Sequence, residues 1–302
     1  MTQILERRIL LLVLVILATV PGWGQQKRED ADTMNNLSPQ QKILGREILA
    51  QQVPEARATA EKLGPAAGPV LLTLAKHEKA RIRLLVLELA PLAPSVDTSR
   101  AVIGLVQDSN SNVRSVAIGD LAVCWQKEVV PDLLKVLEKQ PDPDLTTAVI
   151  RQIGLAGSDR NIGDLRPYES AREQEVAHQA ALAMARLGDG TERKKIIDGL
   201  AALNPQVRVQ ALRDCQYIGD KTLIRYFGPT LDDIRDFMVI TPPHIEPVVT
   251  ARVCDIAVQT MAYMGLQFSF QAQFLARRTV AELEEAKRMV AKMAATSQEI
   301  QP

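Results

Sequence analysis

The sequence predicts an all-α protein, an α-solenoid of stacked two-helix repeats that ends in a C-terminal capping helix. Three observations carry this prediction: the composition, an apolar pattern that recurs about every 31 residues, and a second apolar position 20 residues after each of the first five anchors of that pattern. Hydrophobic residues make up 46% of the 302-residue chain and aromatic residues only 4%. Small and aliphatic side chains suit close helix packing better than a β-sandwich, and we expect no β-sheet.

The repeat is defined by six segments that align without gaps on one apolar anchor. The anchors are Ile82, Val113, Leu145, Val176, Val207 and Val249. Positions 4, 5, 8 and 11 residues after each anchor are apolar in every segment except at Thr260. Offsets 0, 4, 8 and 11 lie on one face of an α-helix. The second helix of each unit is marked at offset 20, by Val102, Leu133, Leu165, Ile196 and Phe227. Neither helix can bury its apolar face alone, so the units must stack.

Glycines and two irregularities punctuate the repeat. Gly157, Gly188 and Gly219 stand at offset 12, where a left-handed helix end favours glycine. In the third unit, glycine and proline interrupt the second helix over residues 161–172. The interval before the last anchor is about ten residues too long, and the excess lies within Asp232–Pro247, whose three prolines exclude a continuous helix.

Residues 1–24 are predicted to be a signal peptide. Two arginines precede the apolar stretch Ile9–Val20, and Gly22 and Gly24 suit cleavage before Gln25. The alternative is an uncleaved anchor, but twelve helical residues span only about 18 Å of a hydrocarbon core of about 30 Å. We therefore expect a periplasmic or secreted protein.

The mature chain is expected to contain three parts. Residues 25–38 form a polar linker, 39–268 the solenoid, and 269–302 the capping helix and tail. Ser38 and Gln41 form a capping box at the first helix, as Thr279 and Glu282 do at the last. The apolar face expected on the last helix comprises Val280, Leu283, Val290 and Met293.

Several segments resemble HEAT-like repeats, of the kind found in phycobilisome lyases and many bacterial proteins. The motifs are Ser111–Ala117, continuing into Glu128–Leu134, then Leu187–Asp189 and Asn204–Ala211. The resemblance covers roughly residues 54–265, and with the signal peptide it identifies the chain as an exported bacterial member. It implies the α-solenoid fold but little about function, because such repeats serve many unrelated roles.

Cysteines and histidines supply little evidence of catalysis. Cys124, Cys215 and Cys254 all fall on the apolar template, so core packing is favoured over a Cys215–Cys254 disulfide. The resemblance also raises the di-iron site that HEAT-like hydroxylases build from repeated His-Glu pairs. Only His77-Glu78 has that form here, which is too few ligands for two metals. We expect no cofactor and no metal.

The arginines that follow the anchors are interpreted as structural braces. Arg83, Arg114 and Arg208 occupy the position that in HEAT-like repeats contacts neighbouring carboxylates or helix ends, and Asp108 and Asp214 are candidate acidic partners.

A partner contact is predicted around the insertion and at one exposed aromatic position. The candidate residues are Trp125, Arg225, Tyr226, Asp232, Asp233, Arg235 and His244. Trp125 takes the place of the glycine at offset 12 in its unit, where it is either wedged between turns or exposed as an anchor. The alternative for the insertion is a loop that packs over the last unit.

The function predicted from these observations is a non-enzymatic scaffold of the cell envelope or exterior that binds a protein or peptide. Lys plus Arg equals Asp plus Glu at 36 each, and removal of residues 1–24 leaves 34 against 35. Such a balance excludes a global field that attracts nucleic acid. One alternative is a chromophore-lyase-like or cofactor-chaperone protein. Another is a membrane-tethered assembly factor, if the signal segment is retained; only then do we expect membrane contact.

Overall fold

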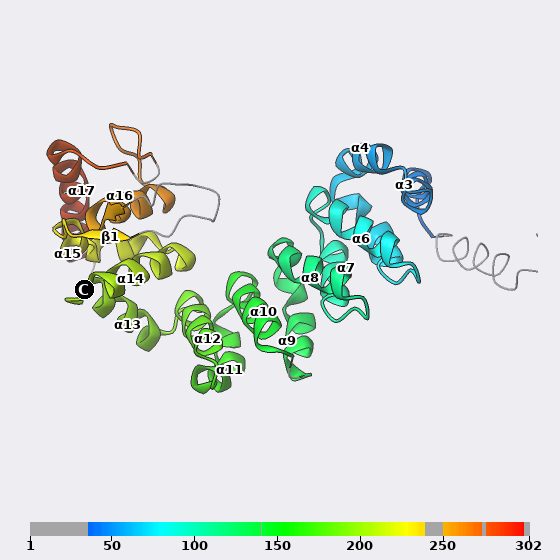
Figure 1. The fold of residues 1–302 in the computed structure, drawn as a ribbon, viewed down its shortest axis with the longest axis horizontal. Coiled ribbons are helices and arrows are strands. Elements are labelled where there is room, and N and C mark those ends of the chain that lie inside the picture. Colours follow the sequence, from blue (N-terminus) through cyan, green and yellow to red (C-terminus); the bar gives the residue numbers. More distant parts are fainter. Residues whose placement is uncertain (1–35, 140, 239–249, 274–275, 299–302) are drawn as a thin grey trace, which may run out of the picture. The chain divides into compact units, whose positions relative to one another are not determined.

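The computed structural model describes residues 36–139, 141–238, 250–273 and 276–298. The predicted signal peptide, almost all of the predicted linker, Val249 and His244 lie outside these residues. The described chain consists of α-helices α3–α17, short 3₁₀ segments and two short strands (Figure 1). In the part described, no helix combines the length and the apolar character needed to cross a membrane.

The helices form two compact units, Met1–Asp132 and Leu133–Pro302, and each is treated by itself. The helices of the first unit, up to the boundary within α9, are α3 (Pro39–Leu49), α4 (Val53–Leu63), α5 (Gly68–Leu74), α6 (Ala80–Leu89), α7 (Val96–Leu105), α8 (Ser111–Gly119) and α9 (Val130–Glu138). The 3₁₀ segments are η1 (Gly64–Ala67), η2 (Ala90–Leu92), η3 (Asp120–Val123) and η4 (Lys127–Val129).

The second unit contains the remaining elements. They are α10 (Pro143–Ala156), η5 (Asp159–Asn161), α11 (Ile162–Leu165), η6 (Arg166–Ser170), α12 (Gln174–Leu187), α13 (Gly190–Leu200), α14 (Pro205–Ile218), η7 (Lys221–Tyr226), α15 (Gly228–Leu231), β1 (Asp236–Met238), β2 (Thr250–Arg252), α16 (Val253–Tyr263) and α17 (Val280–Gln298). Within this unit α10, α12 and α14 follow one another along one face, with α11 and α13 on the other (Figure 1).

The predicted all-α solenoid of helix pairs is confirmed, and so is most of its core register. Four anchors, Ile82, Val113, Leu145 and Val176, are buried, as are all five positions at offset 20. The prediction is wrong at Val207, which is 43% exposed; Val209, two residues later, is buried in its place. At the offset-12 glycines, Gly188 and Gly219 adopt positive φ, whereas Gly157 has φ −80°.

Arginine braces hold neighbouring helices together as predicted. In the first unit, Arg83 forms two hydrogen bonds of 2.7 Å with Asp108 and also donates to the carbonyl oxygens of His77 and Glu78. Arg114 donates to the carbonyl oxygen of Asp108. In the second unit, Arg208 donates to Ala202 O and to the Asp233 carboxylate. Besides pairing with carboxylates, these braces satisfy backbone carbonyl groups in the connections between helices.

The irregular regions of the sequence correspond to irregular structure. The second helix of the third predicted unit is broken into η5, α11 and η6. The insertion contains an antiparallel ladder in which Asp236 pairs with Arg252 and Met238 with Thr250, so the expectation of no β-structure is corrected here. Phe237 packs against the core of the second unit, which favours the extended conformation of this segment.

Both predicted capping boxes are present. Gln41 N donates to Ser38 Oγ and Ser38 N donates to the Gln41 side chain; Thr279 and Glu282 exchange the equivalent bonds. Helix α17 buries Leu283 and Val290 against the second unit, but Val280 is 78% exposed and does not belong to the apolar face.

Candidate functional site

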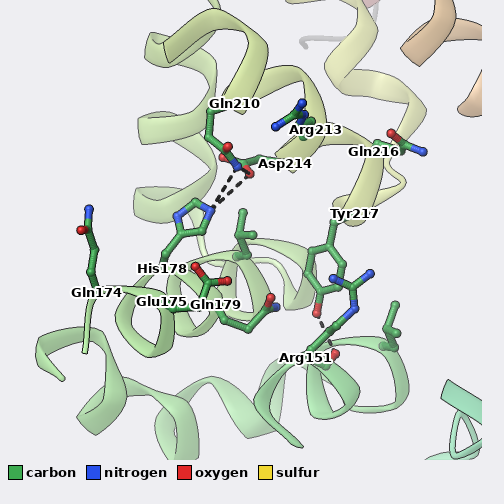
Figure 2. Close-up of a pocket in the computed structure, with 12 residues that line it drawn as sticks. Arg151, Gln174, Glu175, His178, Gln179, Gln210, Arg213, Asp214, Gln216 and Tyr217 are labelled. Carbon is green, nitrogen blue, oxygen red and sulfur yellow. Dashed lines mark hydrogen bonds and ion pairs between the residues drawn. The ribbon is translucent and has the colours of Figure 1, made fainter. Parts of the chain in front are cut away.

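A cleft of about 980 Å³ extends across α10, α12 and α14 in the second unit (Figure 2). Its side chains come from equivalent helices of three successive repeats. The lining residues are Arg151, Leu155, Gln174, Glu175, His178, Gln179, Leu182, Gln210, Arg213, Asp214, Gln216 and Tyr217. Only two of these are aliphatic, so the cleft is strongly polar.

Local sequence signals place the three helices in register. Asp142 caps α10 through its side chain, which accepts from Leu145 N at 3.0 Å, and Pro143 follows at the first helical position. Asn204 and Pro205 start α14 in the same way. Because the three helices bury most of the same apolar offsets, the side chains beside that stripe line up from helix to helix and form the cleft.

One end of the cleft is organised around His178 on α12 and Asp214 on α14. His178 Nε2 lies 3.4 Å from Asp214 Oδ1, and Gln210 Nε2 donates to the same oxygen at 2.8 Å. Asp214 is only 7% exposed. The hydrogen bond to Asp214 raises the pKa of His178, which burial alone would lower. A histidine held by a carboxylate in a cleft is a typical site for proton transfer or anion binding.

The other end is organised around Tyr217, which reaches from α14 to α10. Its hydroxyl donates to Arg151 O at 2.8 Å, and the Arg151 guanidinium lies over the ring with Cζ 5.1 Å from the centroid. Burial raises the pKa of the Tyr217 phenol to about 12, so the hydroxyl is a donor at neutral pH. Gly154 makes room for it, because a Cβ there would lie 2.3 Å from the Tyr217 oxygen.

Three donors of the cleft lack a matching acceptor in the described chain. Neither Arg151 nor Arg213 forms an ion pair with another described residue, although Arg151 stacks on Tyr217. The Nε2 atom of Gln179 is buried, and its interaction with the Tyr217 hydroxyl falls short of a full hydrogen bond. Figure 2 shows Gln179 beside Arg151 and Tyr217. The cleft can therefore donate hydrogen bonds to oxygen atoms of a ligand.

The residues predicted from sequence to contact a partner lie elsewhere. Trp125 is 60% exposed, between η3 and η4 of the first unit. The remaining described candidates, Arg225, Tyr226, Asp232, Asp233 and Arg235, lie in the second unit around α15. Arg225 stacks on Tyr226 at 4.8 Å, and exposed Asp232 pairs with Lys287 of α17 at 2.9 Å.

Asp233 has a structural role that the sequence did not predict. It is 5% exposed, and its carboxylate accepts hydrogen bonds from both Arg208 and Arg235. These bonds lower the pKa of Asp233. A shallower concavity of about 740 Å³ adjoins this cluster and includes Ile234, which is 67% exposed.

The three cysteines are buried thiols, as core packing predicts, and the alternative Cys215–Cys254 disulfide is not formed. Burial raises the pKa of the Cys124 and Cys215 thiols to about 12, which disfavours nucleophilic chemistry. Within the described ranges, no group of three or more His, Cys, Asp or Glu side chains is placed to hold a metal ion.

The sequence did not predict the cleft, because the candidate residues were chosen at positions where the repeat is interrupted. The available signal lay within the repeat. Arg151 and Arg213 share offset 6 from their anchors, and Tyr217 stands at offset 10. The same offsets hold Leu182 in the middle repeat and Leu155 in the first, so this sequence signal is incomplete and the polar cleft becomes evident only in the folded arrangement.

No protein-family model matches this sequence, and no curated protein does. Among solved structures, a similar fold occurs in the complex of CpcE and CpcF of phycocyanin lyase from Nostoc sp. PCC7120. The TM-score is 0.46 and the sequence identity 15%, and the match covers 87% of this chain and 96% of that chain.

The comparison corrects one expectation. The sequence predicted a protein that is not an enzyme, but the similar structure is part of a lyase. The fold therefore gives no ground for excluding catalysis, and the description as non-enzymatic is withdrawn.

Proposed function

We propose that this chain is a HEAT-like repeat protein that binds a protein partner through the cleft of α10, α12 and α14. The observation that carries the proposal is that three successive repeats present polar side chains around one cleft of about 980 Å³. Repeat proteins use such continuous surfaces for binding, because each repeat adds one strip of side chains to the same face.

The lining favours a polypeptide over a small hydrophobic ligand. Pockets for small molecules are mostly apolar with a few polar groups, whereas this cleft has only Leu155 and Leu182 as aliphatic residues. Four glutamines line it, and each amide can both donate to and accept from a peptide group.

Site-specific photo-crosslinking in the source cells tests this proposal. A photoreactive residue at Gln216, exposed in the cleft, should yield one discrete adduct, to be identified by mass spectrometry. The matched control is Lys194, exposed on α13, where the same adduct should be absent. Identical adduct patterns at the two positions, or none at either, would contradict the proposal.

The sequence predicted that the partner contact centres on the insertion, and we propose the insertion here as a second contact beside the cleft. The insertion includes Asp232, Arg235 and His244, the last of which lies outside the described ranges. Because β1 and Phe237 belong to the folded core, a shortened variant must spare them. Replacing residues 239–249 with a two-residue Asn-Gly turn should keep the ladder and weaken the Gln216 adduct. An unchanged adduct would remove the insertion from the interface.

A cofactor-handling protein, lyase-like or chaperone-like, is the second candidate. The observation that favours it is the His178–Asp214 pair, which is competent to move a proton within the cleft. An absorption spectrum of the protein purified from its source is the test. A bound chromophore that is lost in His178→Gln would support this candidate, whereas a spectrum of protein alone would favour the protein-binding proposal.

Export is proposed on the strength of the N-terminal segment alone. The mature chain should begin at Gln25, and intact-mass measurement of the protein from its source checks this. A chain that keeps residues 1–24 and sediments with membranes would instead support the tethered assembly factor.

A further inference from the structure

We infer that the partner segment bound in the cleft is acidic, and that its carboxylate groups pair with Arg151 and Arg213. This inference rests on the proposed binding function and specifies the chemistry of the partner. It is carried by the geometry of Arg151, by the balance of unpaired charge in the cleft and by the buried amide of Gln179.

Arg151 is held ready to bind an anion. Its guanidinium lies over the Tyr217 ring, with Cζ 5.1 Å from the centroid, and the ring in turn is fixed by the hydroxyl bond to Arg151 O and by the close approach to Gly154. Stacking restrains the side chain but leaves the N–H groups at the edge of the plane available. A restrained guanidinium loses less conformational entropy on binding, and its planar fork matches the two oxygens of a carboxylate.

Arg186, the other arginine beside Tyr217, is not available in this way. It donates to the carbonyl oxygens of Tyr217 and Ile218 at the end of α14. Arg186 therefore binds the carbonyl groups at the end of α14, whereas Arg151 faces the cleft.

The unpaired charges of the cleft are predominantly positive. The carboxylate of Asp214 already accepts from Gln210 and lies against His178. Glu175 is then the remaining carboxylate, against the guanidinium groups of Arg151 and Arg213. Protonation of His178 is balanced by the Asp214 carboxylate beside it, so the excess over Glu175 is one positive charge. An acidic ligand would neutralise this excess.

The buried amide of Gln179 points to the same chemistry. Gln179 is 4% exposed, and its interaction with the Tyr217 hydroxyl falls short of a full hydrogen bond. An incompletely paired buried donor is costly, so an oxygen supplied at this end of the cleft would be stabilised there. An acidic peptide offers such oxygens in both its side chains and its backbone.

Nucleic acid is a poor fit, because it requires a broad basic surface with many phosphate contacts. The chain has equal numbers of basic and acidic residues, and only two arginines line the cleft. Inorganic phosphate shares the anionic chemistry but not the extended shape, and it serves as a competitor in the test.

The experiment is fluorescence anisotropy with a labelled, C-terminally amidated peptide of alternating Glu and Ala, using the full mature chain. The peptide should bind, binding should weaken as NaCl is raised, and a peptide with Gln in place of Glu should not bind. Arg151→Gln and Arg213→Gln should each weaken binding roughly tenfold, which corresponds to one charge-assisted hydrogen bond. Glu175→Gln should strengthen it, a gain that unfolding cannot produce.

Lys194→Gln, which removes the same charge from exposed α13, is the matched control and should leave binding unchanged. Any one of three results would overturn the inference. The first is equal binding of the Gln peptide, and the second is full competition by phosphate at a concentration equal to that of the peptide. The third is unchanged binding in both arginine variants. If the acidic peptide fails while the Gln216 photo-adduct forms, the inference fails and the proposed function stands. If neither is observed, both fail.

Discussion

Gly154 is the position where a single added methyl group should disturb both the fold and the cleft. An alanine Cβ there would lie 2.3 Å from the Tyr217 hydroxyl oxygen, 2.8 Å from Ala183 Cβ and 2.9 Å from Ala183 Cα. All three distances are shorter than Cβ contacts tolerate, and the last involves backbone. Gly154→Ala must therefore push α10 away from α12 or expel the tyrosine ring.

The magnitude follows from these contacts. Overpacking a close-packed interior costs about 1–3 kcal/mol, and loss of the Tyr217 hydrogen bond to Arg151 O adds about 1 kcal/mol. The intrinsic helix preference of alanine offsets only about 0.5–1 kcal/mol of this. We expect a net loss of about 2 kcal/mol and a fall in Tm of several degrees.

Urea and thermal unfolding followed by circular dichroism at the helical band measure the loss. Gly163→Ala, in the same unit, is the control, because a Cβ there meets nothing within 4 Å. Adding Tyr217→Phe to Gly154→Ala removes the shortest contact but leaves the two with Ala183, so it should restore stability only in part. A Gly154→Ala variant as stable as the wild type would refute the described packing of α10 against α12 and α14.

The remaining predictions concern two ionic pairs and the repeat register. Burial raises the pKa of Asp108, but the hydrogen bonds from Arg83 and a backbone N–H outweigh this effect and leave the pKa below 3.8. The Arg83–Asp108 pair therefore stabilises the fold above pH 3.8. Its contribution is lost as the pH falls through the lowered pKa. Asp108→Asn should destabilise by about 3 kcal/mol at neutral pH and flatten the acid limb of an unfolding titration. The pKa of His178 is raised above 6.5. Its ion pair with Asp214 is therefore complete below pH 6.5 and is lost as the pH rises through the raised pKa. An NMR titration of the ring protons with a midpoint at 6.5 or below would contradict this. Leu212→Asp, at a fully buried position, should cost several kcal/mol. Gln206→Asp, at an exposed position in the first turn of the same helix, should cost little. Equal urea midpoints for the two variants would show that the register of α14 is wrong.

Much of the fold was predictable from local pattern because repeated helix pairs are specified by short-range signals. Apolar spacing identified the core at Ile82, Val113 and their equivalents, and capping residues marked where α3 and α17 begin. Where the prediction failed, a tertiary contact had overridden the local pattern. Val207 matches the anchor template in sequence but remains 43% exposed, because Val209 takes the buried position of this repeat.

The insertion shows the same limit. Its prolines excluded a helix, but nothing in the sequence of Asp236–Met238 indicates that it pairs with Thr250–Arg252. Strand pairing depends on which segments the fold brings together, and a three-residue strand is too short to show alternation. Asp233 likewise looked like an available surface charge, until the fold placed Arg208 and Arg235 around it.

By itself, the sequence determined the class of fold, the positions of most helices, the buried state of the cysteines and the bracing role of Arg83, Arg114 and Arg208. Each of these depends on periodicity or on neighbours within one repeat. The cleft was decided only by tertiary structure. His178 and Asp214 are 36 residues apart, and Tyr217 contacts Arg151 across 66. Their proximity results from the stacking of α10, α12 and α14, which no pattern within a single helix can encode.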